Sequence, residues 1–329
     1  MHSWTDPLKK ALLIAVAALA VLAPSAGAAT VVNGDFETGN LDGWQVYNST
    51  SQGNWYVFSA AKVNERNDEL EGFGGGRPLF PPTGNFAAYT EEEYPDTAIL
   101  YQDVTLEPYF THQLSMTLGY TSAAPIAAPN TLAVEPGPGS AQNQQLRVDV
   151  VKPTAPLESL NPEDILATPF ANKTGDPQSL PPQTVTSDLS PFAGQTIRIR
   201  IANAVHEEEF NAMVDNVSLL SAPIPNEVKR GKLNLNKRNG SGRLALTVPG
   251  PGILIGVGKG GKNKKVKRAK LVPTGPGTVK LALKPTAKGL KILSAKGRLK
   301  TRIDVFFTPI GGTAGVQTYK ATLKRNLKK

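Results

Sequence analysis

Lysine and arginine side chains gathered in one short stretch have the plainest chemistry in this sequence. Residues 259–270 read KGGKNKKVKRAK, and residues 324–329 add further positive charges. Such a surface attracts polyanions non-specifically, with an affinity that falls as salt concentration rises. The side chains that we expect to contact a polyanion are Lys259, Lys262, Lys264, Lys265, Lys267, Arg268 and Lys270. Few aromatic residues interleave with these cations, which argues against stacking on nucleic-acid bases.

A glycine motif, G-x-G-x-x-G, overlaps the start of this stretch at residues 256–261. A dinucleotide site would need a helix directly after it and an acid about 20 residues later. No acid occurs between Asn263 and Arg302, and Asn263 stands where a phosphate-binding loop needs Ser or Thr. We therefore predict a glycine-rich hairpin turn instead of a nucleotide site.

Side chains suited to catalysis are scarce. The histidines are His2, His112 and His206, and acids gather in the consecutive runs 91–93 and 207–209. A glycosidase needs two carboxylates that face each other across the substrate, whereas consecutive acids on a loop are typical of a solvated surface. No serine stands in a Gly-x-Ser-x-Gly setting. The sequence therefore predicts that the protein is not an enzyme.

Charge is divided unevenly along the 329 residues. The whole chain has a net charge of +9 and no cysteine. Residues 1–222 carry 10 basic and 25 acidic side chains, a balance of −15, and residues 223–329 carry 26 basic and 2 acidic ones, a balance of +24. Such different parts are expected to be separate units. The lack of cysteine excludes disulfide-stapled miniproteins and cysteine-based metal sites.

The positive charge of the second unit has three interpretations. It can bind an anionic wall polymer or polysaccharide, which is the partner that we expect. It can simply keep a β domain soluble and its edge strands unpaired. It can also dock on the acidic first unit of the same chain. The sequence leaves all three open.

The N-terminal segment has the features of an export signal. Two lysines precede the apolar run 11–23, which is shorter than the roughly 20 residues that a membrane-spanning helix needs. Pro24 follows the run, and the small residues 26–28 suit a cleavage site. We expect residues 1–29 to be a signal peptide, no transmembrane segment, and a mature protein that is secreted, extracellular or associated with the cell surface.

Short alternating segments between Gly, Pro, Asn and Asp predict strands along the mature chain. In residues 196–201, isoleucines alternate with Arg198 and Arg200, which predicts one buried face and one polar face. The expected strands are 99–106, 113–120, 146–151 and 196–201 in the first unit, and 232–236, 243–248, 278–283, 302–307 and 318–323 in the second.

Helices are expected to be few and short. Residues 161–166 begin with a capping Asn and a Pro and predict one or two helical turns. Residues 287–293 predict a short helix in the second unit. Residues 71–78 and 123–145 are expected to be long loops.

Two segments resemble a known family. Residues 32–44 (VNGDFETGNLDGW) and 213–219 (MVDNVSL) resemble the opening and closing segments of carbohydrate-binding modules of the galactose-binding-like jelly-roll type. The interior segments 99–104 and 188–200 are similar to the same family. The resemblance covers about residues 31–220. The second unit is similar to basic β domains appended to secreted bacterial proteins.

The resemblance implies the fold and its division. We expect an all-β chain with an N-terminal jelly-roll β-sandwich, residues 30–221, and a smaller immunoglobulin-like β-sandwich, residues 229–329. Residues 222–228, which contain prolines, are expected to form a semi-rigid linker.

The resemblance also implies a structural calcium ion. In modules of this type, the acid of the opening segment and the acid of the closing strand lie side by side and hold calcium with backbone carbonyls. In this sequence they are Glu37 and Asp215, with Asp35 as a possible helper. The alternative is an ordinary surface acid and a turn-forming Asp.

Aromatic residues are the candidates for a sugar site, because pyranose rings stack on exposed Trp or Tyr. The candidates are Trp55, Tyr56, Tyr89, Tyr94 and Tyr101. Trp44 follows a turn at the start of the sandwich and is assigned to the core. The alternative is that Trp55 and Tyr101 are core residues as well.

Together these features predict a secreted, non-enzymatic binding protein. Its jelly roll would bind a carbohydrate and its basic domain would tether the protein to an anionic cell surface or matrix. The alternative is a surface structural or adhesion protein whose jelly roll is a protein-interaction scaffold without a sugar site.

Overall fold

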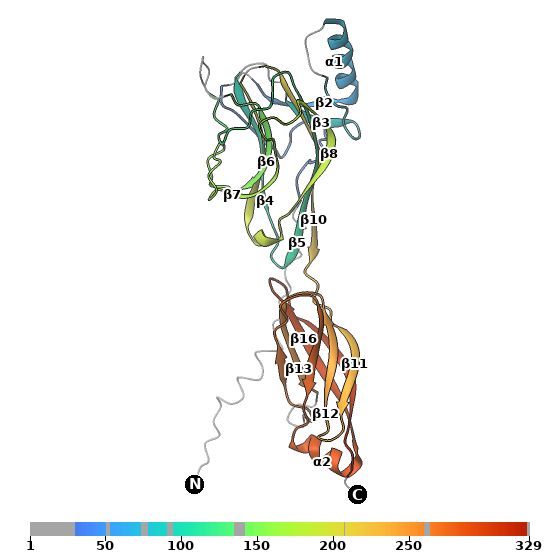
Figure 1. The fold of residues 1–329 in the computed structure, drawn as a ribbon. Coiled ribbons are helices and arrows are strands. Elements are labelled where there is room, and N and C mark those ends of the chain that lie inside the picture. Colours follow the sequence, from blue (N-terminus) through green and yellow to red (C-terminus); the bar gives the residue numbers. More distant parts are fainter. Residues whose placement is uncertain are drawn as a thin grey trace, which may run out of the picture.

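The computed structural model describes residues 30–50, 53–73, 78–90, 95–134, 142–206, 208–259 and 264–327, without the side chains of residues 70–73. The expected signal peptide lies outside these residues. No helix in the described ranges is long and apolar enough to cross a membrane. The predicted fold class is confirmed, since the chain forms two antiparallel β-sandwiches (Figure 1).

In the described residues, the N-terminal sandwich consists of ten strands, one longer helix and a 3-10 turn. In chain order they are β1 (Gln45–Asn48), β2 (Trp55–Ser59), α1 (Ala60–Phe73), β3 (Phe86–Thr90), β4 (Asp96–Thr105), β5 (Phe110–Ser122), β6 (Gln145–Val151), β7 (Ile165–Ala171), β8 (Ser179–Asp188), η2 (Ser190–Phe192), β9 (Thr196–Val205) and β10 (Phe210–Pro223).

The N-terminal sandwich consists of two five-stranded sheets. One has the strand order β1-β4-β9-β6-β7 and the other has the order β2-β3-β10-β5-β8. Apolar side chains at alternate positions, among them Leu100, Leu118 and Ile199, fill the space between the sheets and are fully buried. This alternation is the pattern that the sequence shows most clearly in residues 196–201.

Both outer faces of this sandwich are partly covered. On the first sheet, Leu132 and Leu160 from two long connections pack on Ile99. On the second sheet, Val63 of α1 packs with Tyr89. Each sheet therefore leaves only part of its outer face for a ligand.

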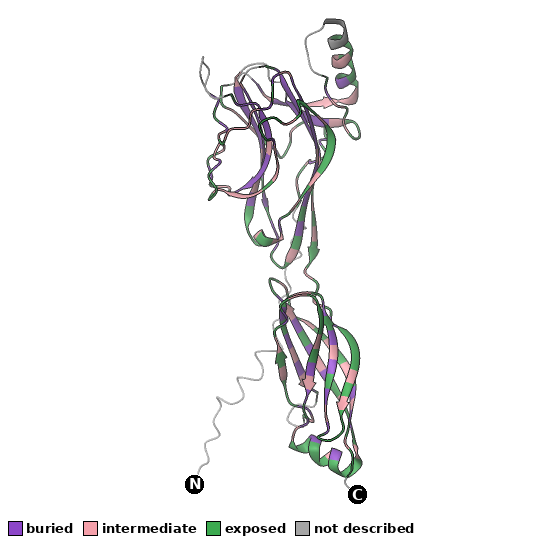
Figure 2. Cartoon of the chain, in the orientation of Figure 1, coloured by how far each residue is buried: buried purple, intermediate pink, exposed green. Residues whose placement is uncertain are grey.

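The described part of the smaller C-terminal sandwich contains seven strands and one helix. They are β11 (Lys229–Asn236), β12 (Ser241–Val248), β13 (Gly252–Gly258), β14 (Ala269–Leu271), β15 (Gly277–Leu283), α2 (Ala287–Lys296), β16 (Arg298–Pro309) and β17 (Gly315–Lys324). The sheet orders are β11-β12-β15 and β14-β13-β16-β17. Figure 2 shows buried and exposed positions alternating along these strands.

The helix α2 confirms the helix expected at residues 287–293. Thr286 caps its N-terminus, because its side chain accepts a hydrogen bond from the Gly289 N–H. Gly297 ends it in the left-handed conformation at φ 66°, where glycine has no steric penalty. Leu293 anchors the helix in the core of the second sandwich.

The two sandwiches are arranged end to end (Figure 1). β10 continues to Pro223, and β11 begins at Lys229, so the connection between strands is residues 224–228. The Ile224 N–H donates to the Tyr109 carbonyl at 3.0 Å, which fixes the start of this connection on the turn before β5.

One local expectation was wrong, and two elements were not foreseen. Residues 162–164 form a single turn, and β7 follows at once instead of a helix. The helix α1 was not foreseen, because residues 60–69 are polar nearly all round and only Val63 is fully buried. It also takes in residues 71–73 of the expected loop 71–78. The strand β8 was missed because it contains Pro181 and Pro182, which an edge strand tolerates.

Candidate functional site

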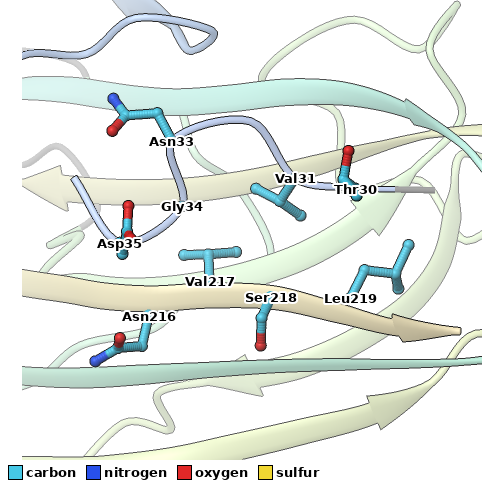
Figure 3. Close-up of a pocket in the computed structure, with 9 residues that line it drawn as sticks. All are labelled: Thr30, Val31, Asn33, Gly34, Asp35, Asn216, Val217, Ser218 and Leu219. Carbon is cyan, nitrogen blue, oxygen red and sulfur yellow. The ribbon is translucent and has the colours of Figure 1, made fainter. Parts of the chain in front are cut away.

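The opening and closing segments meet at a bulge in β10, as the resemblance implies. The Val217 N–H donates to the Gly34 carbonyl at 2.7 Å, and the Trp44 indole N–H donates to the Asn33 carbonyl at 3.1 Å. A shallow hollow of about 470 Å³ lies between the segments (Figure 3). It is lined by Thr30, Val31, Asn33, Gly34, Asp35, Asn216, Val217, Ser218 and Leu219.

Backbone geometry explains why the bulge is there. The register of β10 against β5 shifts between Asp215 and Ser218, and Asn216 has φ 52°, a value that asparagine tolerates better than most residues. The shift frees the Val217 N–H from the β5 ladder, so that it can pair with the opening segment.

The two candidate metal ligands hold the turn that precedes β3. Glu37 accepts hydrogen bonds from the backbone N–H groups of Asn85 and Phe86, at 2.8 and 3.1 Å, and from the Asn85 amide at 2.8 Å. Asp215 accepts from the backbone N–H of Thr83 at 2.8 Å. These hydrogen bonds give both carboxylates a structural use.

The surroundings shift the pKa values of the Glu37 and Asp215 carboxyl groups in opposite directions. Hydrogen bonds from Asn85 and Phe86 lower the pKa of the Glu37 carboxyl below its ordinary value. Burial raises the pKa of Asp215, and the negative charges of Glu37 and Asp35 raise it further against the hydrogen bonds from Thr83 and Asn216. Asp215 therefore lies in a site that favours a neutral group or a nearby cation.

Glu37 and Asp215 are the two carboxylates that the predicted calcium site could use, and they are not part of a larger cluster of metal-ligating side chains in the described residues. Within the described ranges, no group of three or more His, Cys, Asp or Glu side chains could hold a metal ion. A calcium ion, which takes 6–8 oxygens, would have to complete its shell with carbonyls and water. The buried, repelled carboxylate of Asp215 is the observation that fits such a cation.

Burial divides the candidate aromatic residues. Trp55 and Tyr89 are 2% and 0% exposed, so neither offers a ring face to a sugar, and their assignment as stacking residues was wrong. Both sit on strands whose inner or helix-covered face needs large apolar side chains. Trp44 is in the core, as expected. Tyr94 lies outside the described residues.

Tyr56 is exposed, beside α1. Its side chain is 43% exposed, and its ring stacks on Phe58 with centroids 6.0 Å apart and planes 6° apart. Phe58 in turn stacks on Tyr89. Tyr56 is therefore the exposed end of an aromatic row that reaches into the core.

Tyr101 is half-buried on the outer face of the first sheet, where it packs against the apolar cluster around Ile99 and also contacts polar side chains. The Arg198 guanidinium sits over its ring, 4.6 Å from the centroid. Asp103 fixes this guanidinium with two hydrogen bonds of 2.6 and 2.9 Å, which raise the pKa of Arg198 above its ordinary value. The bonded nitrogens are Nε and Nη2. In the described part of the chain, Nη1 has no hydrogen-bond partner within the protein.

Cross-strand pairing extends this setting into a surface, which we call the Tyr101 face. Tyr101 is opposite Gln45 of β1, and Asp103 is opposite Arg198 of β9. Its six residues are Gln45, Tyr101, Asp103, Thr105, Thr196 and Arg198. Four of them are exposed, and the face combines one ring with amide, hydroxyl, carboxylate and guanidinium groups.

A buried ionic cluster lies beside this face. Arg200 and Asp149 are both 0% exposed, and Arg200 Nη2 lies 2.6 Å from Asp149 Oδ2. Arg147 binds the same carboxylate at 2.7 Å. Arg200 Nη1 donates to the carbonyls of Leu157 and Ser159, in the connection that covers it. The sequence placed Arg198 and Arg200 on one polar face but gave no sign of this cover.

The basic segment before β14 lies along the start of α2. The Lys267 N–H donates to the Lys284 carbonyl at 2.8 Å, and the Thr286 N–H donates to the Lys265 carbonyl at 3.0 Å. The exposed candidate cations are Lys259, Lys264, Lys267, Arg268 and Lys270, and Lys265 is half-buried. Lys262 and the expected hairpin turn at residues 260–263 lie outside the described residues. Polyanion binding stays a prediction.

Among the catalytic candidates, His112 is built into the fold. His112 is 1% exposed, with Nδ1 2.8 Å from the Ser221 hydroxyl and Nε2 2.8 Å from the Glu107 carbonyl. This cross-strand pair joins β5 to β10. The acid run 91–93 lies outside the described residues.

Comparison with known proteins gives only distant similarities. No family model matches the chain, and no curated protein matches its sequence. TmCBM61 in complex with β-1,4-galactotriose is 14% identical, with 58% of this chain and 97% of that chain covered and a TM-score of 0.34.

Two further solved structures give similar values. The K3 cleaved adhesin domain of Lys-gingipain from Porphyromonas gingivalis W83 is 12% identical, over 59% of this chain and 98% of that chain, with a TM-score of 0.33. The Stig cyclase Fisc from Fischerella sp. TAU is 17% identical, over 60% and 99%, with a TM-score of 0.33. The function is therefore argued from this chain's own residues.

Proposed function

We propose that this chain is an exported, non-enzymatic binding protein with two attachment surfaces. The jelly roll binds a carbohydrate on the Tyr101 face, and the basic sandwich tethers the protein to an anionic cell surface or matrix. Two weak attachments in one chain gain avidity when both are engaged. The export signal that the sequence predicts in residues 1–29 would bring the protein to where such polymers occur.

One observation supports the proposal that the jelly roll binds a carbohydrate. Tyr101 is half-buried on the outer face of the first sheet, with the Arg198 guanidinium 4.6 Å from its ring centroid, Asp103 fixing that guanidinium, and exposed polar side chains around the pair. Sugars present one apolar ring face and a rim of hydroxyls, so they need an aromatic edge or face with planar donors and acceptors beside it. The Tyr101 face combines a half-buried ring, one side of which Arg198 covers, with exposed polar side chains and Arg198 Nη1 as a donor.

Replacing Tyr101 and Tyr56 with alanine, one at a time, tests this assignment. Tyr101→Ala should weaken binding to a neutral polysaccharide by about tenfold or more, and Tyr56→Ala should leave it unchanged. Affinity electrophoresis in gels that contain soluble neutral polysaccharides measures both variants against the unmodified mature chain. Loss of binding in Tyr56→Ala alone would move the site to the second sheet.

A second candidate function is favoured by the burial of Trp55 and Tyr89. With these rings in the core, few aromatic residues are left for sugar stacking. The jelly roll would then be an adhesion scaffold that binds protein, without a sugar site. Absence of binding to every polysaccharide by the unmodified chain would favour this candidate.

The proposal includes a calcium ion held by Glu37 and Asp215. Calcium would supply positive charge to two nearby carboxylates and tie the opening segment, the turn before β3 and the β10 bulge together. Because the pKa of Asp215 is raised, its contribution to stability without metal is present at low pH and is lost as pH rises through that pKa. A bound cation would cancel this loss.

Thermal unfolding with and without calcium tests the ion. At a calcium concentration of about 100 times Kd, binding adds about 2.7 kcal/mol, which is roughly 5–10 °C in Tm for a domain of this size. The Tm should rise with calcium at neutral pH, and the rise should vanish in a Glu37→Gln and Asp215→Asn double variant. An unchanged Tm of the unmodified chain with calcium and with a chelator would contradict the site.

A further inference from the structure

The outer face of the sheet β14-β13-β16-β17 carries an apolar band. Phe306 of β16 is paired with Ile255 of β13 on one side and with Val316 of β17 on the other. Phe306 is 37% exposed, Val316 is 58% exposed, and Ile253, two residues before Ile255, is 41% exposed. Val272, beyond β14, is 63% exposed. Exposed apolar side chains on neighbouring strands form a patch and not scattered exceptions.

The same face is cationic further along the same strands. Arg302 is paired with Lys320, and Arg298 with Lys324, and all four side chains are exposed. The Lys259 N–H donates to the Arg302 carbonyl, which adds Lys259 at the edge of this group.

Cations also reach the apolar band, and the acid on this face is already engaged. Lys270 is paired with Ile255. Asp304 accepts a hydrogen bond from Thr318 at 2.7 Å, and it is one of the two acids in residues 223–329. One face thus joins an apolar band to an array of positive charges. Figure 2 shows both exposed and partly buried positions along β13 and β16.

The chemistry of this face decides between its possible occupants. An anionic polysaccharide or wall polymer would neutralise the cations but would leave the apolar band in water. A second copy of this domain would bring two strongly positive surfaces together. An anionic lipid bilayer matches both the cations and the apolar band, because its phosphates attract lysine and arginine and its acyl region accepts Phe, Ile and Val.

We propose that this face lies on an anionic lipid bilayer, with Ile253, Phe306 and Val316 at the acyl boundary and Arg302, Lys320 and Lys324 at the phosphates. This inference rests on the proposed tethering function and names the surface to which the basic sandwich attaches. The cations near the bilayer surface contribute an attraction that salt screens, and the apolar band adds a contribution that salt does not screen.

Vesicle binding of the mature full chain tests the proposal. The probes are vesicles of phosphatidylglycerol mixed with phosphatidylcholine, vesicles of phosphatidylcholine alone, and dextran sulfate as a polyanion without acyl chains. The band variant carries Ile253→Thr, Phe306→Thr and Val316→Thr, and the matched control is Leu290→Thr, an exposed apolar position on α2. The band variant should bind mixed vesicles about tenfold or more weakly and dextran sulfate equally well, and the control should match the unmodified chain.

A single substitution gives a second readout that does not depend on the triple variant folding. In Phe306→Trp the new indole should be quenched by brominated acyl chains, whereas Trp44 and Trp55 are buried in the other sandwich. No quenching, or a band variant that binds mixed vesicles like the unmodified chain, would overturn the bilayer inference and leave the tether intact. If the unmodified chain binds neither mixed vesicles nor dextran sulfate, both the bilayer inference and the proposed tether are overturned.

Discussion

Replacing Asp149 with asparagine is expected to lower the free energy of unfolding of the jelly roll by about 3–5 kcal/mol. The carboxylate is fully buried between Arg200 and Arg147, with contacts of 2.6 and 2.7 Å. Asparagine cannot neutralise either guanidinium, and Arg200 is itself 0% exposed. An uncompensated charge would therefore remain in the interior, beneath the connection that contains Leu157.

The matched control is the other Arg–Asp pair between the same group of strands. Asp103 binds Arg198 with similar geometry but is 40% exposed, so Asp103→Asn should cost only about 0–1 kcal/mol. Urea unfolding of both variants, followed by circular dichroism, measures the difference. Equal losses in the two variants would contradict the burial argument.

Acid should reduce the stability that the Arg147–Asp149–Arg200 cluster gives to the jelly roll. Burial raises the pKa of Asp149, but the hydrogen bond from Arg147 and the charges of Arg200 and Arg147 outweigh this, so the pKa lies below its ordinary value of 3.8. A lowered pKa in the folded state contributes stability above the ordinary value, and this contribution is lost as pH falls through the folded pKa. In Asp149→Asn, this part of the acid dependence should be missing.

Gly34→Ala is expected to have the next largest effect. A Cβ at this position would lie 1.9 Å from the Val217 carbonyl oxygen and 2.9 Å from its carbon, both of which are backbone atoms of β10. The strand cannot move away without breaking the 2.7 Å hydrogen bond between Val217 and Gly34. We expect a loss of about 1–3 kcal/mol or more, because overpacked sites force backbone shifts.

Gly250→Ala is the control for this substitution. A Cβ there would meet no atom within 4 Å, so the change should stay within about 0.5 kcal/mol. Differential scanning calorimetry of both variants provides the measurement. A Gly34→Ala protein as stable as the unmodified chain would show that the opening segment does not need its close approach to the bulge.

Regular alternation made much of the fold predictable. Ile197, Ile199 and Ile201 are buried because every second residue of a strand points inward, and the sequence alone supports that inference. The helix α1 was not predictable in this way, because residues 60–69 are mostly polar and Val63 is the fully buried side chain among them. Such a segment has no regular apolar pattern from which a helix can be predicted.

The candidate site was harder to predict than the fold. An aromatic residue in a strand is exposed or buried according to which face it takes and what covers that face. Trp55 points into the sandwich, whereas its neighbour Tyr56 points out. Arg198 and Arg200 share a face, yet the connection through Leu157 covers only Arg200. Such covers join residues far apart in sequence, which no local spacing reveals.

The division of charge joins the two halves of the proposal. The structure places the +24 segment in a sandwich with its own core, at one end of the acidic sandwich (Figure 1). The positive charge of the second domain favours an anionic surface, whereas binding of an uncharged sugar to the first domain does not depend on net charge. Salt should therefore separate the two activities.

The most direct test is a glycan array probed with the mature full chain at low and high salt. The account predicts that binding to one class of neutral glycans persists at high salt and is lost in Tyr101→Ala, while binding to anionic glycans disappears at high salt in both proteins. Neutral-glycan binding that Tyr101→Ala retains, or no neutral-glycan binding at either salt concentration, would contradict the central claim.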